Sequence, residues 1–127
     1  MKPHFHHHYT LAEARALLPQ IRRWLQKLDD LGAQLQTDEQ SLQTLLAKGC
    51  DAGGQVTDRW VRAMADFRGI IAEFEAREIQ LKDLARGLLD FPAIIDGREV
   101  FLCWEKDEDD IEHWHDLDAG YAGREKL

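Results

Sequence analysis

Long apolar runs and cysteine pairs are both missing from this chain of 127 residues. No stretch approaches the roughly 20 apolar residues that a membrane span needs, and the N-terminus lacks the apolar core of a signal peptide. The two cysteines, Cys50 and Cys103, give neither a disulfide framework nor a C-x-x-C zinc spacing. We therefore expect a cytoplasmic protein with free thiols and no membrane contact.

Recognisable catalytic motifs are missing as well. The sequence contains no G-x-S-x-G, no H-E-x-x-H, no P-loop and no dinucleotide fingerprint. It has 44% apolar and 31% charged residues, which is ordinary globular composition. We expect a single domain over residues 1–127, and whether it is an enzyme stays open, with the balance against.

Negative charge gathers in one segment. Residues 105–118 carry eight acidic side chains and one lysine, a local charge of −7, whereas the whole chain has −8. Such a segment repels phosphate backbones, so nucleic acid is not an expected partner. A cation or a basic protein surface suits it better.

The first nine residues contain four histidines, at positions 4, 6, 7 and 8. Because they precede any periodic pattern, we interpret residues 1–9 as a disordered His-rich leader or the remnant of a purification tag. A native metal-binding arm is the alternative, and the sequence cannot distinguish the two.

Residues 10–86 have the pattern of helices. Thr10 and Glu13 form a capping box, so a helix begins at residue 11. Pro19 would interrupt it, which favours a short helix over 11–17, a bend, and a second helix over 19–48, in which a kink near 32–40 stays open. A third helix is predicted over 57–86, ended by Gly87.

The two long helices would be equal in length, about 45 Å each, and should form an antiparallel helical hairpin. Trp60, Phe67 and Phe74 add an apolar stripe that one hairpin cannot bury. We expect a second copy of the chain to cover it, giving a homodimer. The alternative is that the β segment and the short first helix cover the stripe within one chain.

After Gly87 the apolar period changes to two. "FPAII" (91–95), a turn at Asp96-Gly97 and "REVFLCW" (98–104) predict a β-hairpin. Both faces of 98–104 are apolar, so this strand should be central and the Cys103 thiol buried, with a raised pKa. "IEHWH" (111–115) predicts a third strand. The fold class is then α+β, a helical hairpin preceded by a short helix and packed with a three-stranded antiparallel meander, followed by an acidic C-terminal segment within 87–127.

Four blocks of the chain resemble a bacterial family of uncharacterised proteins catalogued as domain of unknown function 2203. They are "YTLAEARALLP" (9–19), "IQLKDLARGLLDFPA" (79–93), "DGREVFLCW" (96–104) and "IEHWHDLDAGYAGR" (111–124). The resemblance implies no activity, because the family is uncharacterised. It implies that motif positions are occupied by Lys82, Asp83, Gly87, Asp90, Phe91, Pro92, Cys103, Trp104, Glu108, Trp114, His115, Gly120 and Arg124. The chain departs from the family pattern at Asp107 and His113.

The pair His113 and His115 is the candidate metal site. On a strand, residues i and i+2 face the same side, so both imidazoles could bind one divalent transition metal. Glu108 or Asp116 would supply the further carboxylate ligand. The structural alternative is that both histidines are solvated side chains at the edge of the sheet. For His115 alone, the structural alternative is a ring held by a carboxylate such as Glu108 or Asp83. No cofactor is certain from the sequence.

A second candidate is a pocket for a small anionic ligand, formed by Lys82, Asp83, His115 and Arg124. The guanidinium of Arg124 could clamp a carboxylate or a phosphate. Asp90, before Phe91-Pro92, is expected to accept backbone N–H groups in the turn between helix and strand. Of these alternatives, the sequence favours an interaction or assembly module that forms a homodimer. It names no activity, substrate, pathway or protein partner, nor which metal would bind.

Overall fold

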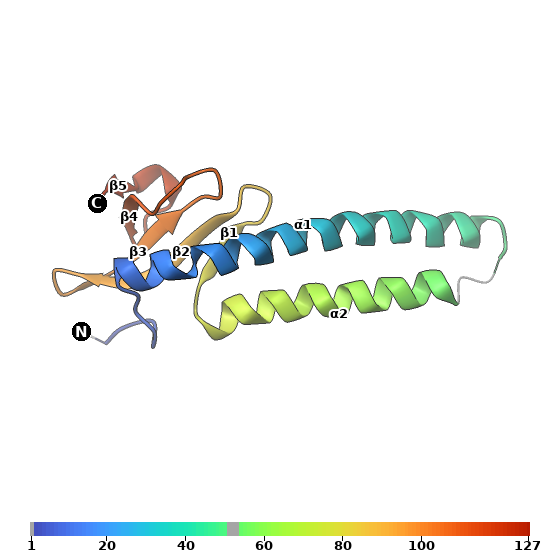
Figure 1. Ribbon diagram of the computed structural model, residues 1–127, viewed down its shortest axis with the longest axis horizontal. Helices are drawn as coiled ribbons and strands as arrows, with labels where there is room; N and C mark the ends of the chain where they lie inside the picture. Colours follow the sequence, from blue (N-terminus) through green and yellow to red (C-terminus); the bar gives the residue numbers. More distant parts are fainter. Residues whose placement is uncertain (1, 51–53) are drawn as a thin grey trace. The chain divides into compact units, whose positions relative to one another are not determined.

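Two helices are followed by five strands in the computed structural model, which describes residues 2–50 and 54–127. The elements are α1 (Leu11–Ala47), α2 (Gln55–Ala76), β1 (Gln80–Asp83), β2 (Leu88–Ile95), β3 (Arg98–Trp104), β4 (His113–Asp116), the 3-10 turn η1 (Tyr121–Gly123) and β5 (Glu125–Lys126) (Figure 1). The chain divides into a sheet unit, Met1–Arg23 with Glu73–Leu127, and a helical unit, Trp24–Ala72. The α+β class is confirmed.

Helix α1 begins where the sequence predicted and continues further than expected. The capping box is present, since Thr10 N–H donates to Glu13 Oε1 over 3.0 Å and Glu13 N–H donates to Thr10 Oγ1 over 3.1 Å. The predicted break at Pro19 is wrong, because one helix passes through it and through Gly32. An interior proline costs about 3 kcal/mol. Burial of Leu18 and Ile21 on either side offsets that cost.

Helix α2 is shorter than predicted. It ends at Ala76, and Glu78 has a positive φ of 57°, which turns the chain out of the helix. Residues 80–83, predicted as helical, form strand β1 instead, with Leu81 opposite Leu89 of β2. The two helices have 37 and 22 residues, so the predicted equal lengths are wrong.

The sheet has five antiparallel strands in the order β1-β2-β3-β4-β5, where the sequence predicted three. The Asp96-Gly97 turn, β3 as the middle strand and β4 as its neighbour are confirmed. Gly87 lies in the turn between β1 and β2 with φ +61°, and a Cβ there would lie 2.7 Å from Lys106 Cβ. Glycine is therefore required at that turn.

The two faces of the sheet differ. Directly opposed residues share a face. The buried part of the helix-side face on β2 and β3 is apolar, with the side chains Leu89, Phe91, Ala93, Val100, Leu102 and Trp104. The start of α1 covers it: Figure 1 shows the first turns beside β2 and β3, and the Arg22 guanidinium lies 4.9 Å from the Trp104 ring centroid. The other face, called the pocket-side face here, carries Asp90, Phe101, Cys103, His113 and His115.

The N-terminal residues belong to the sheet unit and are not a disordered leader. Backbone N–H groups of residues 4–5 donate to the buried carboxylate of Glu99 over 2.8 and 3.0 Å, and those of residues 6–7 donate to Glu78 over 2.7 Å. The Phe5 ring lies 5.4 Å from that of Phe101. Two carboxylates therefore hold this segment through its backbone.

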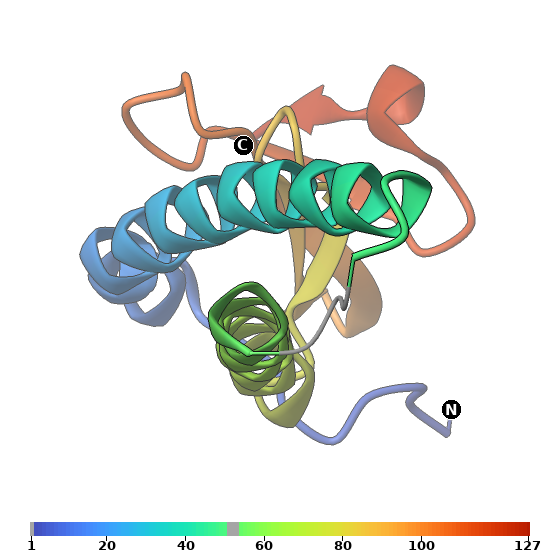
Figure 2. The ribbon, with the colours of Figure 1, turned by 90° about the vertical axis from the view of Figure 1, so that its right-hand side faces the viewer.

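In the helical unit the two helices run in opposite directions and lie side by side (Figures 1 and 2). An ion pair of 3.2 Å joins Asp38 of α1 to Arg59 of α2. Asp38 is buried, and its Oδ2 has no hydrogen-bond partner among the described residues. Over the described part of the chain, neither helix offers an apolar stretch sufficient to cross a bilayer.

Candidate functional site

A pocket of about 230 Å³ opens on the pocket-side face of the sheet. Side chains from β1 to β4 form its floor, and the segment after β4 forms one wall. The lining residues are Lys82, Leu88, Asp90, Phe101, Cys103, His115, Leu117, Ala119, Gly120 and Tyr121. The antiparallel register therefore brings four strands of this unit to one concave site.

Asp90, Cys103 and His115 form a buried cluster in this pocket. One ligand atom from each, a carboxylate oxygen, Sγ and a ring nitrogen, lies within 4.8 Å of the other two. Their exposed fractions are 3%, 1% and 2%. Asp90 lies opposite Cys103 between β2 and β3, and His115 enters from β4 beside them. No other group of three such residues this close occurs in residues 2–50 and 54–127.

The partners of the two ring nitrogens of His115 show which nitrogen must carry a hydrogen. Its Nδ1 lies 2.8 Å from the carbonyl oxygen of Asp116, and a carbonyl can only accept, so Nδ1 carries a hydrogen. Its Nε2 lies 2.9 Å from Asp90 Oδ1. That contact needs one proton, held either by the imidazolium or by the carboxylic acid. Nε2 is thus the nitrogen that faces Asp90 and Cys103.

Cys103 is not an activated nucleophile. Burial raises the pKa of its thiol to about 12, and the charge of Asp90 adds to this effect, outweighing the opposing effect of Arg124. Both ring nitrogens of His115 already have partners, so neither is available as a base for the thiol. The predicted burial and raised pKa of Cys103 are confirmed.

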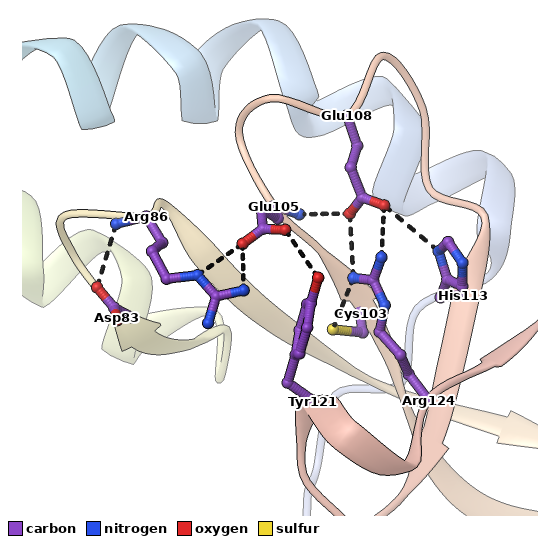
Figure 3. Close-up of polar contacts among 8 residues, drawn as sticks. All are labelled: Asp83, Arg86, Cys103, Glu105, Glu108, His113, Tyr121 and Arg124. Atoms are coloured by element: carbon purple, nitrogen blue, oxygen red, sulfur yellow. Dashed lines mark hydrogen bonds and ion pairs between the residues drawn. The ribbon is translucent and has the colours of Figure 1, made fainter.

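Arg124 connects the buried cluster to an ion network (Figure 3). Its NH1 donates to Cys103 Sγ over 3.7 Å, and NH1 and NH2 bind Glu108 over 3.2 and 2.7 Å. Burial acts to lower the pKa of Arg124, but the hydrogen bonds that it donates to Glu108 and Cys103 outweigh burial and raise the pKa. Glu108 also lies 3.4 Å from His113 Nδ1. The guanidinium is therefore held in place beside the sulfur.

Tyr121 is held in a similar way at the edge of the pocket. The guanidinium carbons of Arg86 and Arg124 lie 4.4 and 4.3 Å from its ring centroid. Its hydroxyl contacts Glu105 over 3.2 Å, and Glu105 in turn binds Arg86 (Figure 3). These contacts fix the wall formed by the segment after β4.

The predicted metal ligands are not gathered as a set. His115 lies in the buried cluster, whereas His113 contacts Glu108 and lies opposite Cys103 on β3. Asp116 points to the other face, where it pairs with Arg98 over 3.1 Å. Alternation along β4 separates Asp116 from the two histidines. The carboxylate that holds His115 is Asp90, rather than Glu108 or Asp83.

The predicted anionic-ligand residues are brought together in part. Lys82 and His115 both line the pocket. Asp83 instead accepts the backbone N–H of Arg86 over 3.1 Å, in the turn after β1. Arg124 is already clamped by Glu108. Asp90, expected in a turn, is buried in β2, because that strand begins three residues earlier than predicted.

Asp90 and Cys103 were the site residues that sequence reasoning missed, although a signal was present. With Asp96-Gly97 as a two-residue turn, Ile95 of β2 pairs with Arg98 of β3. Each residue earlier in β2 then pairs with the residue one position later in β3. Extending that register places Asp90 directly opposite Cys103. Predicting a strand from residue 91 stopped the count one pair too early.

A comparison with models of known protein families shows which family the chain belongs to. The family model described as "Uncharacterized conserved protein (DUF2203)" matches residues 7–127. The chain belongs to the DUF2203 family. The match covers the sheet unit from His7 onward and the whole helical unit of this DUF2203 chain. No curated protein matches it, and no solved structure does.

Proposed function

We propose that this DUF2203 protein binds one divalent transition-metal ion through Asp90, Cys103 and His115 Nε2. The observation that carries the proposal is the buried cluster itself, three different ligand atoms within 4.8 Å of one another at a pocket. The hydrogen bond from His115 Nδ1 to a backbone carbonyl supports it. Metal-binding histidines commonly use their second nitrogen in this way.

The ligand types favour zinc-like ions. Thiolate and imidazole prefer Zn²⁺, Co²⁺ and related ions, whereas Ca²⁺ and Mg²⁺ prefer oxygen ligands alone. Around a tetrahedral ion with such bond lengths, ligand atoms lie roughly 3.3–3.6 Å apart. The contact of 2.9 Å between His115 and Asp90 needs to open by about half an ångström to admit the ion.

Binding should release protons. The thiol of Cys103, with a pKa of about 12, and the single proton between Asp90 and His115 both occupy positions that the metal would take. The affinity should therefore rise with pH. Three protein ligands leave a coordination position that faces the pocket, the arrangement typical of catalytic rather than structural zinc. Such an open position would suit a metal-assisted hydrolase. The proposal made here is limited to metal binding.

The test must separate this site from the N-terminal histidines. Deleting residues 1–8 would remove the segment held by Glu78 and Glu99. Replacing His4, His6, His7 and His8 together by glutamine, here called the Gln background, keeps the backbone N–H groups that those carboxylates bind. Equilibrium dialysis with Zn²⁺ and elemental analysis then measure ions per chain.

We expect one zinc per chain in the Gln background, lost on His115→Ala and retained on His113→Ala. Because His115→Ala also removes a buried partner, Cys103→Ser gives a milder second variant, and the exposed Cys50→Ser is its matched control. Zinc retained by both His115→Ala and Cys103→Ser would contradict the proposal. Loss of zinc on His113→Ala, with zinc retained on Cys103→Ser, would instead favour the ligands predicted from the sequence, His113 and His115 with Glu108 or Asp116.

We also propose self-association through α2, the function that the sequence favoured. Trp60 and Phe67, seven residues apart, are only half-buried, whereas Phe74 is buried within the chain and leaves no surface for a partner. Sedimentation at micromolar concentration should give twice the mass of 14.7 kDa. Phe67→Asp should give the monomer, and a wild-type monomer would end this proposal.

A further inference from the structure

We infer that the pocket takes a small carboxylate whose anionic head lies between the metal and Lys82. This inference deepens the proposed function and rests on it. It follows from three features of the pocket: the charge of the loaded site, the apolar lining and the position of Lys82.

Charge selects an anionic head. A divalent ion contributes +2, and the carboxylate of Asp90 and the thiolate of Cys103 contribute −1 each, so the loaded centre is neutral while His115 stays uncharged. Lys82 then adds +1. It is the one lysine or arginine among the described residues that line the pocket. A single negative charge complements such a site better than a cation or a doubly charged group.

The other cations near the pocket are already engaged. Arg86 binds Glu105 over 2.8 Å, and Arg124 binds Glu108 over 2.7 Å. Both guanidinium groups also lie against the Tyr121 ring. Lys82 differs, because it is exposed and its Nζ lies 5.7 Å from the centroid of the Phe101 ring, a contact that leaves its N–H donors available.

Apolar walls select the rest of the ligand. Leu88, Phe101 and Leu117 line the pocket beside the cluster, and Phe101 lies 5.5 Å from the His115 ring. A pocket of about 230 Å³ is smaller than the roughly 300 Å³ at which drug-sized sites begin. A short hydrocarbon body therefore fits, and a nucleotide or a long acyl chain does not.

Butyrate and butylammonium are the probes, since they share a hydrocarbon body and differ in head charge. Each is titrated calorimetrically into the zinc-loaded Gln background, with inorganic phosphate as a third probe. We expect butyrate to bind and butylammonium to give no heat of binding. Lys82→Met should lower the affinity for butyrate roughly fivefold, which is the effect of losing one exposed ion pair. The zinc content should remain at one ion per chain. Lys27→Met, which alters an exposed lysine of the helical unit, should change neither.

Three results would overturn the inference with zinc still bound. They are equal binding of both butyl probes, tighter binding of phosphate than of butyrate, and butyrate binding that is unchanged when zinc is removed. Absence of zinc in the dialysis experiment would instead remove the proposed function and this inference together. The two failures are therefore distinguished by the metal content of the same sample.

Discussion

The two faces of strand β3 are both buried but differ in chemistry. Val100, Leu102 and Trp104 face the start of α1 and meet apolar partners from β2. Phe101 and Cys103 face the other way, where Asp90 and His115 are also buried. Burying polar groups costs free energy unless they are paired. A stable fold needs the helix-side face, whereas the polar groups of the pocket-side face suggest a function.

The largest effect is expected on the helix-side face. Trp104→Ala should lower the free energy of unfolding by about 3–5 kcal/mol, because it leaves a cavity among the best buried side chains. Urea denaturation measures the loss. Trp60→Ala, at a half-buried position on α2, is the control and should cost less. A cost at Trp104 under about 1 kcal/mol would contradict the assignment of this face as the core.

On the pocket-side face, His115→Leu should cost about 3 kcal/mol because it leaves the Asp90 carboxylate buried without its partner. Adding Asp90→Leu should recover much of the loss, since replacing both members of a buried pair by apolar groups is often neutral. The comparison uses urea denaturation of the two single variants and the double variant. Additive losses would show that the pair is not coupled, contrary to the geometry.

Glu99→Gln should cost about 1–3 kcal/mol at neutral pH, by weakening the hydrogen bonds that hold residues 4–5. Burial acts to raise the pKa of Glu99, but hydrogen bonds from His4, Phe5 and His8 outweigh it and lower the pKa from 4.5 to about 2. A lowered pKa stabilises the fold above the unfolded value, so this contribution is lost as pH falls from about 4.5 to about 2. Unfolding measured across that range should show wild type and variant converging, and a constant difference would contradict the assigned pKa.

The smallest effect is expected at an exposed pair. Arg98 and Asp116 lie 3.1 Å apart with side chains 58% and 45% exposed. Arg98→Ala should therefore change the free energy of unfolding by less than about 1 kcal/mol, and by less still in high salt. Thermal denaturation at two salt concentrations measures it. A loss as large as that of His115→Leu would show that this contact is not a surface ion pair.

Sequence patterns were sufficient where one local signal acts alone. The Thr10 capping box, the Asp96-Gly97 turn and the alternation along β3 each predicted what the structure contains. Alternation failed at the ends of the sheet, because β5 has two residues and β1 has four, too few for a recognisable period.

The helix boundaries could not be predicted from local signals. Leu81 and Leu84 continue the apolar spacing of α2, yet the helix ends at Ala76 and the backbone turns left-handed at Glu78. At Pro19 the reverse occurs: the sequence predicts a break in the helix, but α1 continues through the proline because its neighbours Leu18 and Ile21 are buried. The candidate site depends on register rather than on a motif. Asp90 is 13 residues before Cys103 and 25 before His115, and no spacing rule connects the three.

Cobalt absorption tests the metal centre most directly, because a bond between Co²⁺ and a thiolate gives an intense near-ultraviolet band that other ligands do not give. Titrating the Gln background with Co²⁺ should produce this band, saturating at one ion per chain. Cys50→Ser should leave it unchanged and Cys103→Ser should abolish it. A band that survives Cys103→Ser, or no band in the background protein, would contradict a metal centre at Asp90, Cys103 and His115.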